Sequence, residues 1–203
     1  MTSAMLACGL EQPWETPMTF TYHDEETAPD ASKPLMERSR KGFGMLPNLH
    51  KILAAAPITY RAYVDSFEAF MNESSFSKLE AQIVFMTANY ENDCHYCTAG
   101  HSWAMAAAKM PADVIEALRE GQPLSDPKLE ALRRFARDLL THRGHIGDAR
   151  LQAFLDAGYT KAQALEVLCG LSAKLISNFT NALAHTELDP PMNDFAWTHP
   201  SKR

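Results

Sequence analysis

The sequence predicts an all-α protein, and three observations support that prediction. Apolar residues recur at helical spacing along most of the chain, no run alternates with a period of two over more than a few residues, and no hairpin dipeptide separates two apolar runs. The length of 203 residues and the 46% apolar content fit an ordinary globular protein of one domain or a small two-domain array. We expect an N-terminal extended arm over residues 1–33, a single helical domain over 34–190 and a C-terminal tail over 191–203.

The N-terminal arm combines prolines with acidic residues, which together prevent a continuous helix. The residues concerned are Pro13, Pro17, Pro29, Pro34 and the run Asp24-Glu25-Glu26. Three aromatic residues in the same stretch, Trp14, Phe20 and Tyr22, are unusual for a disordered tail. We therefore expect the arm to pack on the rest of the protein.

Prolines and glycines delimit the first helices of the domain. We expect a short helix from Pro34 to about Lys41 and a helical stretch from Pro47 to Ala56. Pro57 suits the first turn of the next helix, whose apolar face comprises Tyr60, Val64, Phe67, Phe70 and Met71.

Caps and glycines delimit the later helices. Ser77 and Glu80 form a capping box that begins a helix over residues 79–90, which leads into an alanine-rich helix. Three helices follow over about 111–121, 127–144 and 148–158, the second of them capped by Asp126. A second capping box, Thr160 with Gln163, begins the longest helix, about 161–185. We expect its apolar positions to face the core: Leu165, Val167, Leu168, Leu171, Leu175, Ile176 and Phe179.

Two cysteines and a histidine stand out at the start of the alanine-rich helix. Cys94, Cys97 and His101 fall on one face if the segment is helical, and Asn92 or Asp93 can cap that helix. Cys94 would then occupy the first turn, where the helix dipole and free N–H groups favour a thiolate. This spacing is typical of a redox or a metal site.

Composition limits the partners and the compartment. A net charge of −6 and a pI near 5.7 argue against nucleic acid or an anionic membrane as the main partner, because both require a basic face. No window approaches eighteen consecutive apolar residues, and no Lys or Arg precedes the apolar patch in residues 1–12, as a secretory signal requires. Four cysteines are too few for a disulfide scaffold. We therefore expect a cytoplasmic protein.

A metal or haem site is not the expected use of the motif. Cys94, Cys97 and His101 are good zinc ligands, but a structural site requires a fourth, and His142 with His145 is a weak candidate pair. Covalent haem attachment is excluded because Thr98, rather than histidine, follows Cys97. We expect no metal and no cofactor.

A redox site requires a low-pKa thiolate, a second thiol and a base, and the motif contains one of each. His101 lies one helical turn after Cys97, so it should activate that sulfur. The helix dipole instead favours Cys94, and the sequence does not rank the two effects. Two packing cysteines on a buried helix are the structural alternative.

The run from Glu91 to Ser102 resembles the Cys-x-x-Cys-x-x-x-His signature of the alkylhydroperoxidase-D-like, carboxymuconolactone decarboxylase superfamily. The resemblance covers roughly residues 40–190. It includes Met45-Leu46-Pro47-Asn48-Leu49, Asn181 to His185 and Leu188-Asp189-Pro190, which look like the peroxidase-related branch. It implies an oligomeric helical bundle, from dimer to hexamer, whose site is lined by neighbouring subunits. It also implies that Asn181 and His185 lie near that site, whereas their spacing alone indicates a helix cap or a core contact.

The resemblance also implies a reaction. A thiolate would attack the O–O bond of a hydroperoxide, a disulfide would form between Cys94 and Cys97, and a dithiol electron donor would reduce it. The decarboxylating branch lacks the cysteine pair, so decarboxylation is not expected. Family members place a relay glutamate twelve residues before the first cysteine, and here that position is Gln82.

Glutamine cannot take a proton, so Gln82 would only orient His101 or a water. Glu80 is the nearest carboxylate on the same helix and is a further catalytic candidate, although its capping role explains it as well. Our hypothesis is a peroxidase or disulfide oxidoreductase with Cys97 as nucleophile, Cys94 as resolving thiol and His101 as base. The alternative, which the missing carboxylate favours, is a non-catalytic or redox-sensing helical oligomer that binds a small molecule or a partner.

Overall fold

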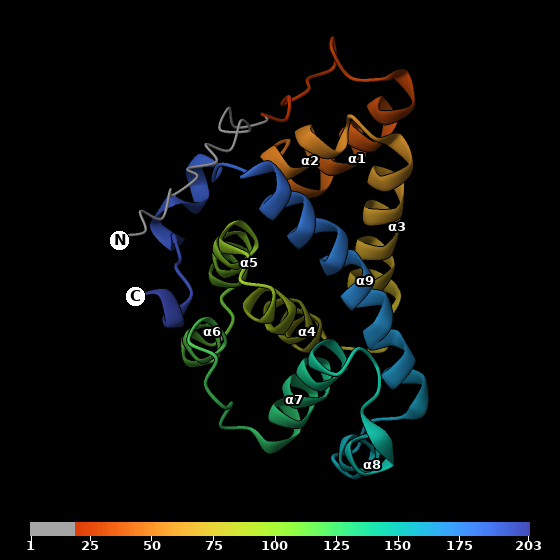
Figure 1. Ribbon diagram of the computed structural model, residues 1–203, viewed down its shortest axis with the longest axis vertical. Helices are drawn as coiled ribbons and strands as arrows, with labels where there is room; N and C mark the ends of the chain where they lie inside the picture. Colours follow the sequence, from red (N-terminus) through yellow and green to blue (C-terminus); the bar gives the residue numbers. More distant parts are fainter. Residues whose placement is uncertain (1–18) are drawn as a thin grey trace, which may run out of the picture.

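The computed structural model describes residues 19–203, and over that range it contains helices and no strands (Figure 1). The all-α prediction is therefore confirmed. The α-helices are α1 (Lys33–Phe43), α2 (Asn48–Leu53), α3 (Pro57–Glu73), α4 (Lys78–Glu91), α5 (His95–Ala107), α6 (Ala112–Arg119), α7 (Pro127–Thr141), α8 (Gly147–Asp156) and α9 (Lys161–Ala184). Three short 3-10 helices are η1 (Asp30–Ser32), η2 (Pro190–Phe195) and η3 (Pro200–Lys202).

Local signals determine where several helices begin. At α4, the Glu80 amide donates to Ser77 Oγ at 3.2 Å, and the Ser77 amide donates to Glu80 Oε2 at 2.9 Å. The corresponding bonds at α9 join Thr160 and Gln163 at 3.1 and 2.9 Å. Both predicted capping boxes therefore form, and Asp126 caps α7 as expected.

Helix α4 occupies the centre of the fold and packs against α7 and α9, while α3 and α9 lie side by side along one edge (Figure 1). Residues 81–89 of α4 are all buried. The contact between α3 and α9 is close because Gly170 has no side chain: a Cβ there would lie 2.7 Å from the Phe70 ring. A core of aromatic rings fills the space between α3 and α4, with the Phe70 and Phe85 centroids 5.2 Å apart.

Seven apolar positions of α9 were expected to face the core, and this prediction is wrong for four of them. Val167 and Leu171 are buried, but Leu165, Leu168, Leu175 and Phe179 are 47–69% exposed. The face that points inward instead carries small and polar residues, because α9 packs closely on α3 and contributes to a polar site. Its members include Gly170, Ala173, Lys174, Ser177, Asn178 and Asn181.

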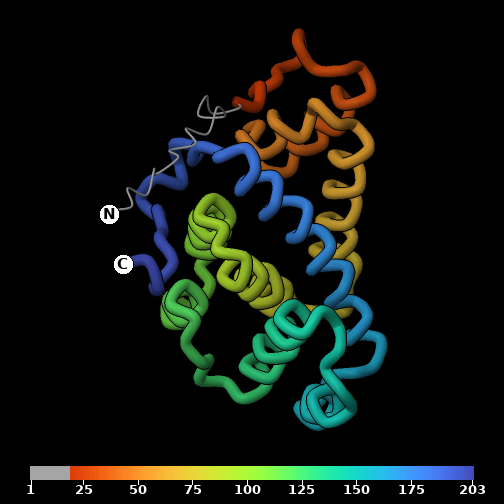
Figure 2. The backbone as a smooth tube through the Cα atoms, viewed as in Figure 1, coloured from red at the N-terminus to blue at the C-terminus, as the bar shows by residue number. Residues whose placement is uncertain are grey.

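The chain after α9 returns along α5 and α6, as the tube in Figure 2 shows. His185 ends α9 in a left-handed conformation, with φ at 49°. Asp189 then accepts hydrogen bonds from the Asn48 amide, at the start of α2, and from the Tyr96 hydroxyl of α5. This carboxylate therefore fixes the position of α5 relative to α2.

The described part of the N-terminal arm packs on this same region. The Glu187 amide donates to the Tyr22 hydroxyl at 3.0 Å, and the His23 amide donates to the Lys51 carbonyl at 3.1 Å. The expected packing of Trp14 lies outside the described residues. None of the helices in the described range combines the length and apolar character needed to cross a membrane.

Candidate active site

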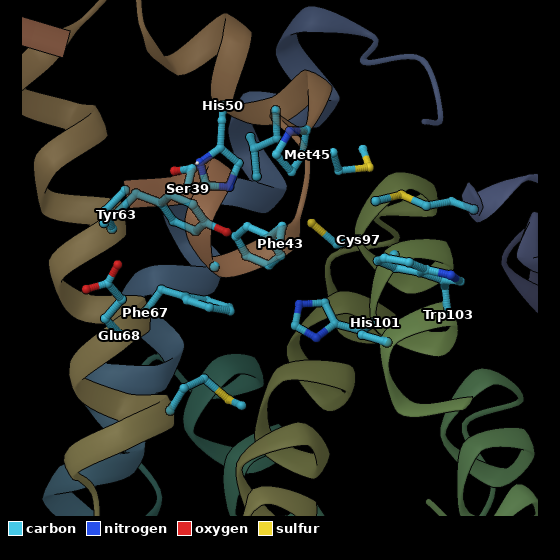
Figure 3. A pocket seen from close by; sticks show the side chains of 18 of the residues that line it. Ser39, Phe43, Met45, His50, Tyr63, Phe67, Glu68, Cys97, His101 and Trp103 are labelled. Carbon is cyan, nitrogen blue, oxygen red and sulfur yellow. Dashed lines mark hydrogen bonds between the residues drawn. The ribbon is translucent and has the colours of Figure 1, made fainter. Parts of the chain in front are cut away.

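A cavity of about 690 Å³ is lined by residues of α1, α2, α3, α4, α5 and α9 (Figure 3). Its walls include the aromatic side chains of Phe43 from α1, Tyr63 and Phe67 from α3, and Trp103 from α5. Cys97 and His101 of α5 face the same space. The cavity is larger than hydrogen peroxide requires and can hold an organic molecule.

The two sulfurs lie at the start of α5. The helix begins later than predicted, because Asp93 has a positive φ of 49° and Cys94 itself takes the N-cap position. The Cys97 amide donates to Cys94 Sγ at 3.4 Å, so one sulfur caps the turn that carries the other. Both cysteines are buried and free, and Cys97 lines the cavity whereas Cys94 does not.

Their surroundings shift the pKa values of the two thiols in opposite directions. Burial on its own raises the pKa of Cys97, but the hydrogen bond from Cys94 and the positive charge of Lys174 outweigh it and hold that pKa well below its usual value. Donating that hydrogen bond, together with burial, raises the pKa of Cys94. These surroundings therefore favour the thiolate form at Cys97 and the protonated thiol at Cys94.

A polar stripe on α9 completes the surroundings of Cys97. Asn181 Nδ2 donates to Cys97 Sγ at 3.2 Å, and Ser177 Oγ lies 3.8 Å from the same sulfur. Asn178 also lowers the pKa of Cys97. These side chains and Lys174 are at most 1% exposed. The stripe therefore places buried polar side chains around the sulfur.

His101 forms hydrogen bonds with two residues, and neither of them is Cys97. Its Nδ1 donates to Gln82 Oε1 at 2.7 Å, because an amide oxygen can only accept. Its Nε2 therefore has no proton and accepts from Lys174 Nζ at 3.0 Å. Burial, followed by the charge of Lys174, holds the pKa of His101 well below its usual value, so the imidazole is neutral.

The structure brings together three of the five predicted site residues on the cavity wall: Gln82, Cys97 and His101. Glu80 lies elsewhere, with its carboxylate bound to Ser77 and to the Tyr159 hydroxyl. The expectation for Asn181 is confirmed by its contact with Cys97, whereas His185 is an exposed residue at the end of α9.

Three cavity residues were missed by sequence reasoning. Tyr63 points its hydroxyl into the cavity, and burial raises its pKa, so it stays protonated (Figure 3). His50 is bound through Nδ1 to Ser39 Oγ at 2.6 Å, and burial lowers its pKa to about 3. Lys174 could have been found, because Lys174, Ser177, Asn178 and Asn181 form a polar stripe at helical spacing within an apolar helix.

Residues 19–203 contain no cluster of three or more His, Cys, Asp or Glu side chains suited to a metal ion. Asn181 donates a hydrogen bond to the Cys97 sulfur, and Lys174 donates one to His101.

No protein-family model matches the sequence, and no curated protein is detectably similar to it. Solved structures do share its fold. A peroxidase-related protein from Ralstonia eutropha, described as an alkylhydroperoxidase AhpD core, has a TM-score of 0.75 at 18% identity, covering 85% of this chain and 93% of that one. A peroxidase-related protein from a Silicibacter species has a TM-score of 0.67 at 21% identity, covering 90% and 95%.

The debrominase Bmp8, solved as a cysteine-to-alanine variant with 2,3,4-tribromopyrrole, has a TM-score of 0.72 at 16% identity, covering 86% of this chain and 93% of that one. These matches span most of the chain and nearly the whole of each solved structure. The chain therefore has the all-α fold of the alkylhydroperoxidase AhpD core and its peroxidase-related neighbours.

Proposed function

We propose that this protein is a thiol-dependent peroxidase and disulfide oxidoreductase that reduces hydrogen peroxide or organic hydroperoxides through Cys94 and Cys97. The observation that carries the proposal is the Cys97 thiol, which lines a cavity of about 690 Å³ with its pKa held well below the usual value. A second thiol, Cys94, caps the same helical turn. Low pKa, access to a cavity and an adjacent thiol are the features of a peroxide-reactive cysteine.

The chemistry proceeds in three steps. The Cys97 thiolate attacks one oxygen of the hydroperoxide, so that an S–O bond forms as the O–O bond breaks, and the departing alkoxide or hydroxide takes up a proton. The Cys94 thiol then attacks the sulfenic sulfur, which forms the disulfide and releases water. A dithiol donor, which a reducing cytoplasm would supply, exchanges with that disulfide and restores both thiols.

Self-association is part of the proposal. An exposed apolar face runs along α9, and its residues are Leu165, Leu168, Leu175, Phe179 and Leu183. Contiguous apolar surface of this kind is typical of interfaces. A homo-oligomer that covers this face, with two to six subunits, accords with the resemblance.

Two observations favour other functions. Gln82 cannot move a proton, which favours a redox-sensing oligomer whose thiols oxidise without turnover. The aromatic walls formed by Phe43, Phe67 and Trp103 suit a flat ring, and one structural neighbour is a debrominase. A thiol-dependent dehalogenase is thus the second candidate enzyme, and release of bromide from 2,3,4-tribromopyrrole would identify it.

The test is consumption of cumene hydroperoxide with a dithiol donor by four proteins: the wild type, Cys97→Ser, Cys94→Ser and the control Cys169→Ser. We expect turnover in the wild type and the control, and none in the other two. Cys94→Ser should accumulate a sulfenic acid at Cys97 that dimedone labels, because the resolving thiol is absent. Full turnover in Cys97→Ser would refute the assigned roles, and thiol oxidation without turnover in the wild type would favour the sensor.

A further inference from the structure

A lysine lies in the core of the protein with no acidic side chain beside it. Lys174 is 1% exposed, and its Nζ lies 3.0 Å from His101 Nε2 and 5.4 Å from the centre of the Phe85 ring. Among residues 19–203, no carboxylate comes within ion-pair distance of this ammonium. An ammonium buried without an anion is costly, so a negative charge must be near.

Only one of the other ionisable groups on the cavity wall can supply that charge. They are Arg38, His50, Tyr63, Glu68, Tyr96, Cys97 and His101. Glu68 is already paired with Arg38 at 2.6 Å, and both are about 40% exposed. Burial keeps His50 and His101 neutral by lowering their pKa values, and it keeps Tyr63 and Tyr96 neutral by raising theirs. Cys97 is the remaining group that can be an anion.

The hydrogen-bond directions also determine which group holds a mobile proton. Gln82 fixes the single proton of His101 on Nδ1, which leaves Nε2 as an acceptor for Lys174. The imidazole therefore has no proton directed at the cavity, and Gln82 has none to exchange. The ammonium of Lys174 lines the cavity and is bound to His101 Nε2, so it is an acid that can give up a proton on this wall.

We propose that Lys174 is both the charge partner of the Cys97 thiolate and the proton donor to the oxygen that leaves during peroxide cleavage. The first role is independent of the substrate, whereas the second rests on the proposed peroxidase function. His101, held by Gln82, is a positioning residue that orients the ammonium through Nε2.

Protons are conserved over one catalytic cycle. The thiolate and the hydroperoxide give the sulfenic acid and an alkoxide, and the alkoxide takes a proton from Lys174, leaving an alcohol and a neutral amine. Cys94 and the sulfenic acid then give the disulfide and water. Reduction by a dithiol returns two thiols, and the Cys97 thiol passes its proton to the amine, which restores the charge pair.

Three variants separate the two roles. Lys174→Met and Lys174→Gln remove the charge, whereas Lys174→Arg keeps a charge that cannot be given up as a proton. Lys161→Met, at the exposed start of α9, is the control.

The first readout is the pH midpoint of Cys97 alkylation by iodoacetamide, followed by mass spectrometry. The second is the rate of single-turnover oxidation by cumene hydroperoxide, divided by the thiolate fraction at each pH. Circular dichroism checks that each variant is folded.

We expect the midpoint to move up by about 1–3 pH units in Lys174→Met and Lys174→Gln, and to stay near the wild-type value in Lys174→Arg and the control. The rate per thiolate should fall by about 10²–10⁴-fold in all three Lys174 variants, including the arginine variant. An unchanged midpoint in folded Lys174→Met or Lys174→Gln would overturn the charge role. An unchanged rate per thiolate in Lys174→Arg would overturn the proton donor.

The two proposals fail in different ways. A wild-type protein that does not react with hydroperoxides would overturn the peroxidase function and, with it, the proton-donor role. The alkylation midpoint requires no peroxide chemistry, so its movement in Lys174→Met would still support the charge pair.

Discussion

Replacement of Asn181 by leucine removes one hydrogen-bond donor from the Cys97 sulfur and keeps a side chain of similar volume. In the wild type, Asn181 Nδ2 donates to Cys97 Sγ at 3.2 Å, and no part of Asn181 is exposed. A hydrogen bond to a charged group contributes about 1.5–3 kcal/mol, and about 1.4 kcal/mol corresponds to one pH unit. The pKa of Cys97 should therefore rise by about 1–2 pH units.

The same replacement should cost little stability. Asn181 Oδ1 is buried and has no hydrogen-bond partner in the described part of the chain, so leucine also removes an unsatisfied acceptor. We expect the free energy of unfolding to change by no more than about 1 kcal/mol. A large loss of stability would show that the amide holds α9 in place rather than tuning the sulfur.

The assay measures Cys97 alkylation by iodoacetamide between pH 5 and pH 10, and urea unfolding reports stability. Asn193→Leu, an exposed asparagine after α9, is the matched control and should behave as the wild type. If folded Asn181→Leu kept the wild-type midpoint, the hydrogen bond seen at Sγ would have no role in stabilising the thiolate, and the reasoning would be refuted.

Three further predictions concern stability and assembly. Burial lowers the pKa of His50 from 6.5 to about 3, so the unfolded state binds a proton that the folded state does not as pH falls from 6.5 to 3. The free energy of unfolding should fall by up to about 5 kcal/mol across that window, and it should fall less in His50→Gln. Urea titrations at several pH values measure this, and an equal dependence of stability on pH in the two proteins would contradict it. Phe179→Lys should sediment as a smaller species than the wild type, unlike the control Ile58→Lys, which changes an exposed residue of α3; a monomeric wild type would contradict the interface. Asp189→Ala should lose about 2–3 kcal/mol of stability in urea, because it leaves the Asn48 amide and the Tyr96 hydroxyl without an acceptor, and an unchanged midpoint would contradict that reasoning.

Local signals explain why most helix boundaries could be predicted. The capping boxes at Ser77 and Thr160 depend on residues three positions apart, so the sequence contains everything that forms them. The start of α5 was less predictable because Asp93 takes a positive φ, which moves the cap to Cys94. Sequence reasoning had no signal for that backbone conformation.

The inward face of α9 could not be assigned by hydropathy alone. Leu165 and Phe179 are as apolar as Val167 and Leu171, but the exposed pair lies on the face that no other described element covers. Hydropathy places all four in the core, whereas the close approach of α3 at Gly170 determines which side packs. An apolar face that is free in one subunit is indistinguishable in sequence from a core face.

The sequence predicted which residues form the site better than it predicted the hydrogen bonds between them. The motif identified Cys94, Cys97 and His101, and one-turn spacing paired His101 with Cys97. In the structure His101 is bound by Gln82 from α4, as predicted, and by Lys174 from α9 rather than by Cys97. Lys174 is 73 residues away along the chain, and only the tertiary fold brings its charge to the cavity.

Stopped-flow oxidation of the thiols tests the central claim most directly. The wild type, with Cys97→Ser as the reference, is mixed at neutral pH with hydrogen peroxide or with cumene hydroperoxide, and the loss of thiolate is followed. If Cys97 is a stabilised thiolate in a cavity that admits an organic molecule, cumene hydroperoxide should oxidise the wild type at least about 10²-fold faster than it oxidises free cysteine. Cys97→Ser should lack this reaction. A wild-type rate no faster than that of free cysteine with either peroxide would contradict the peroxidase function.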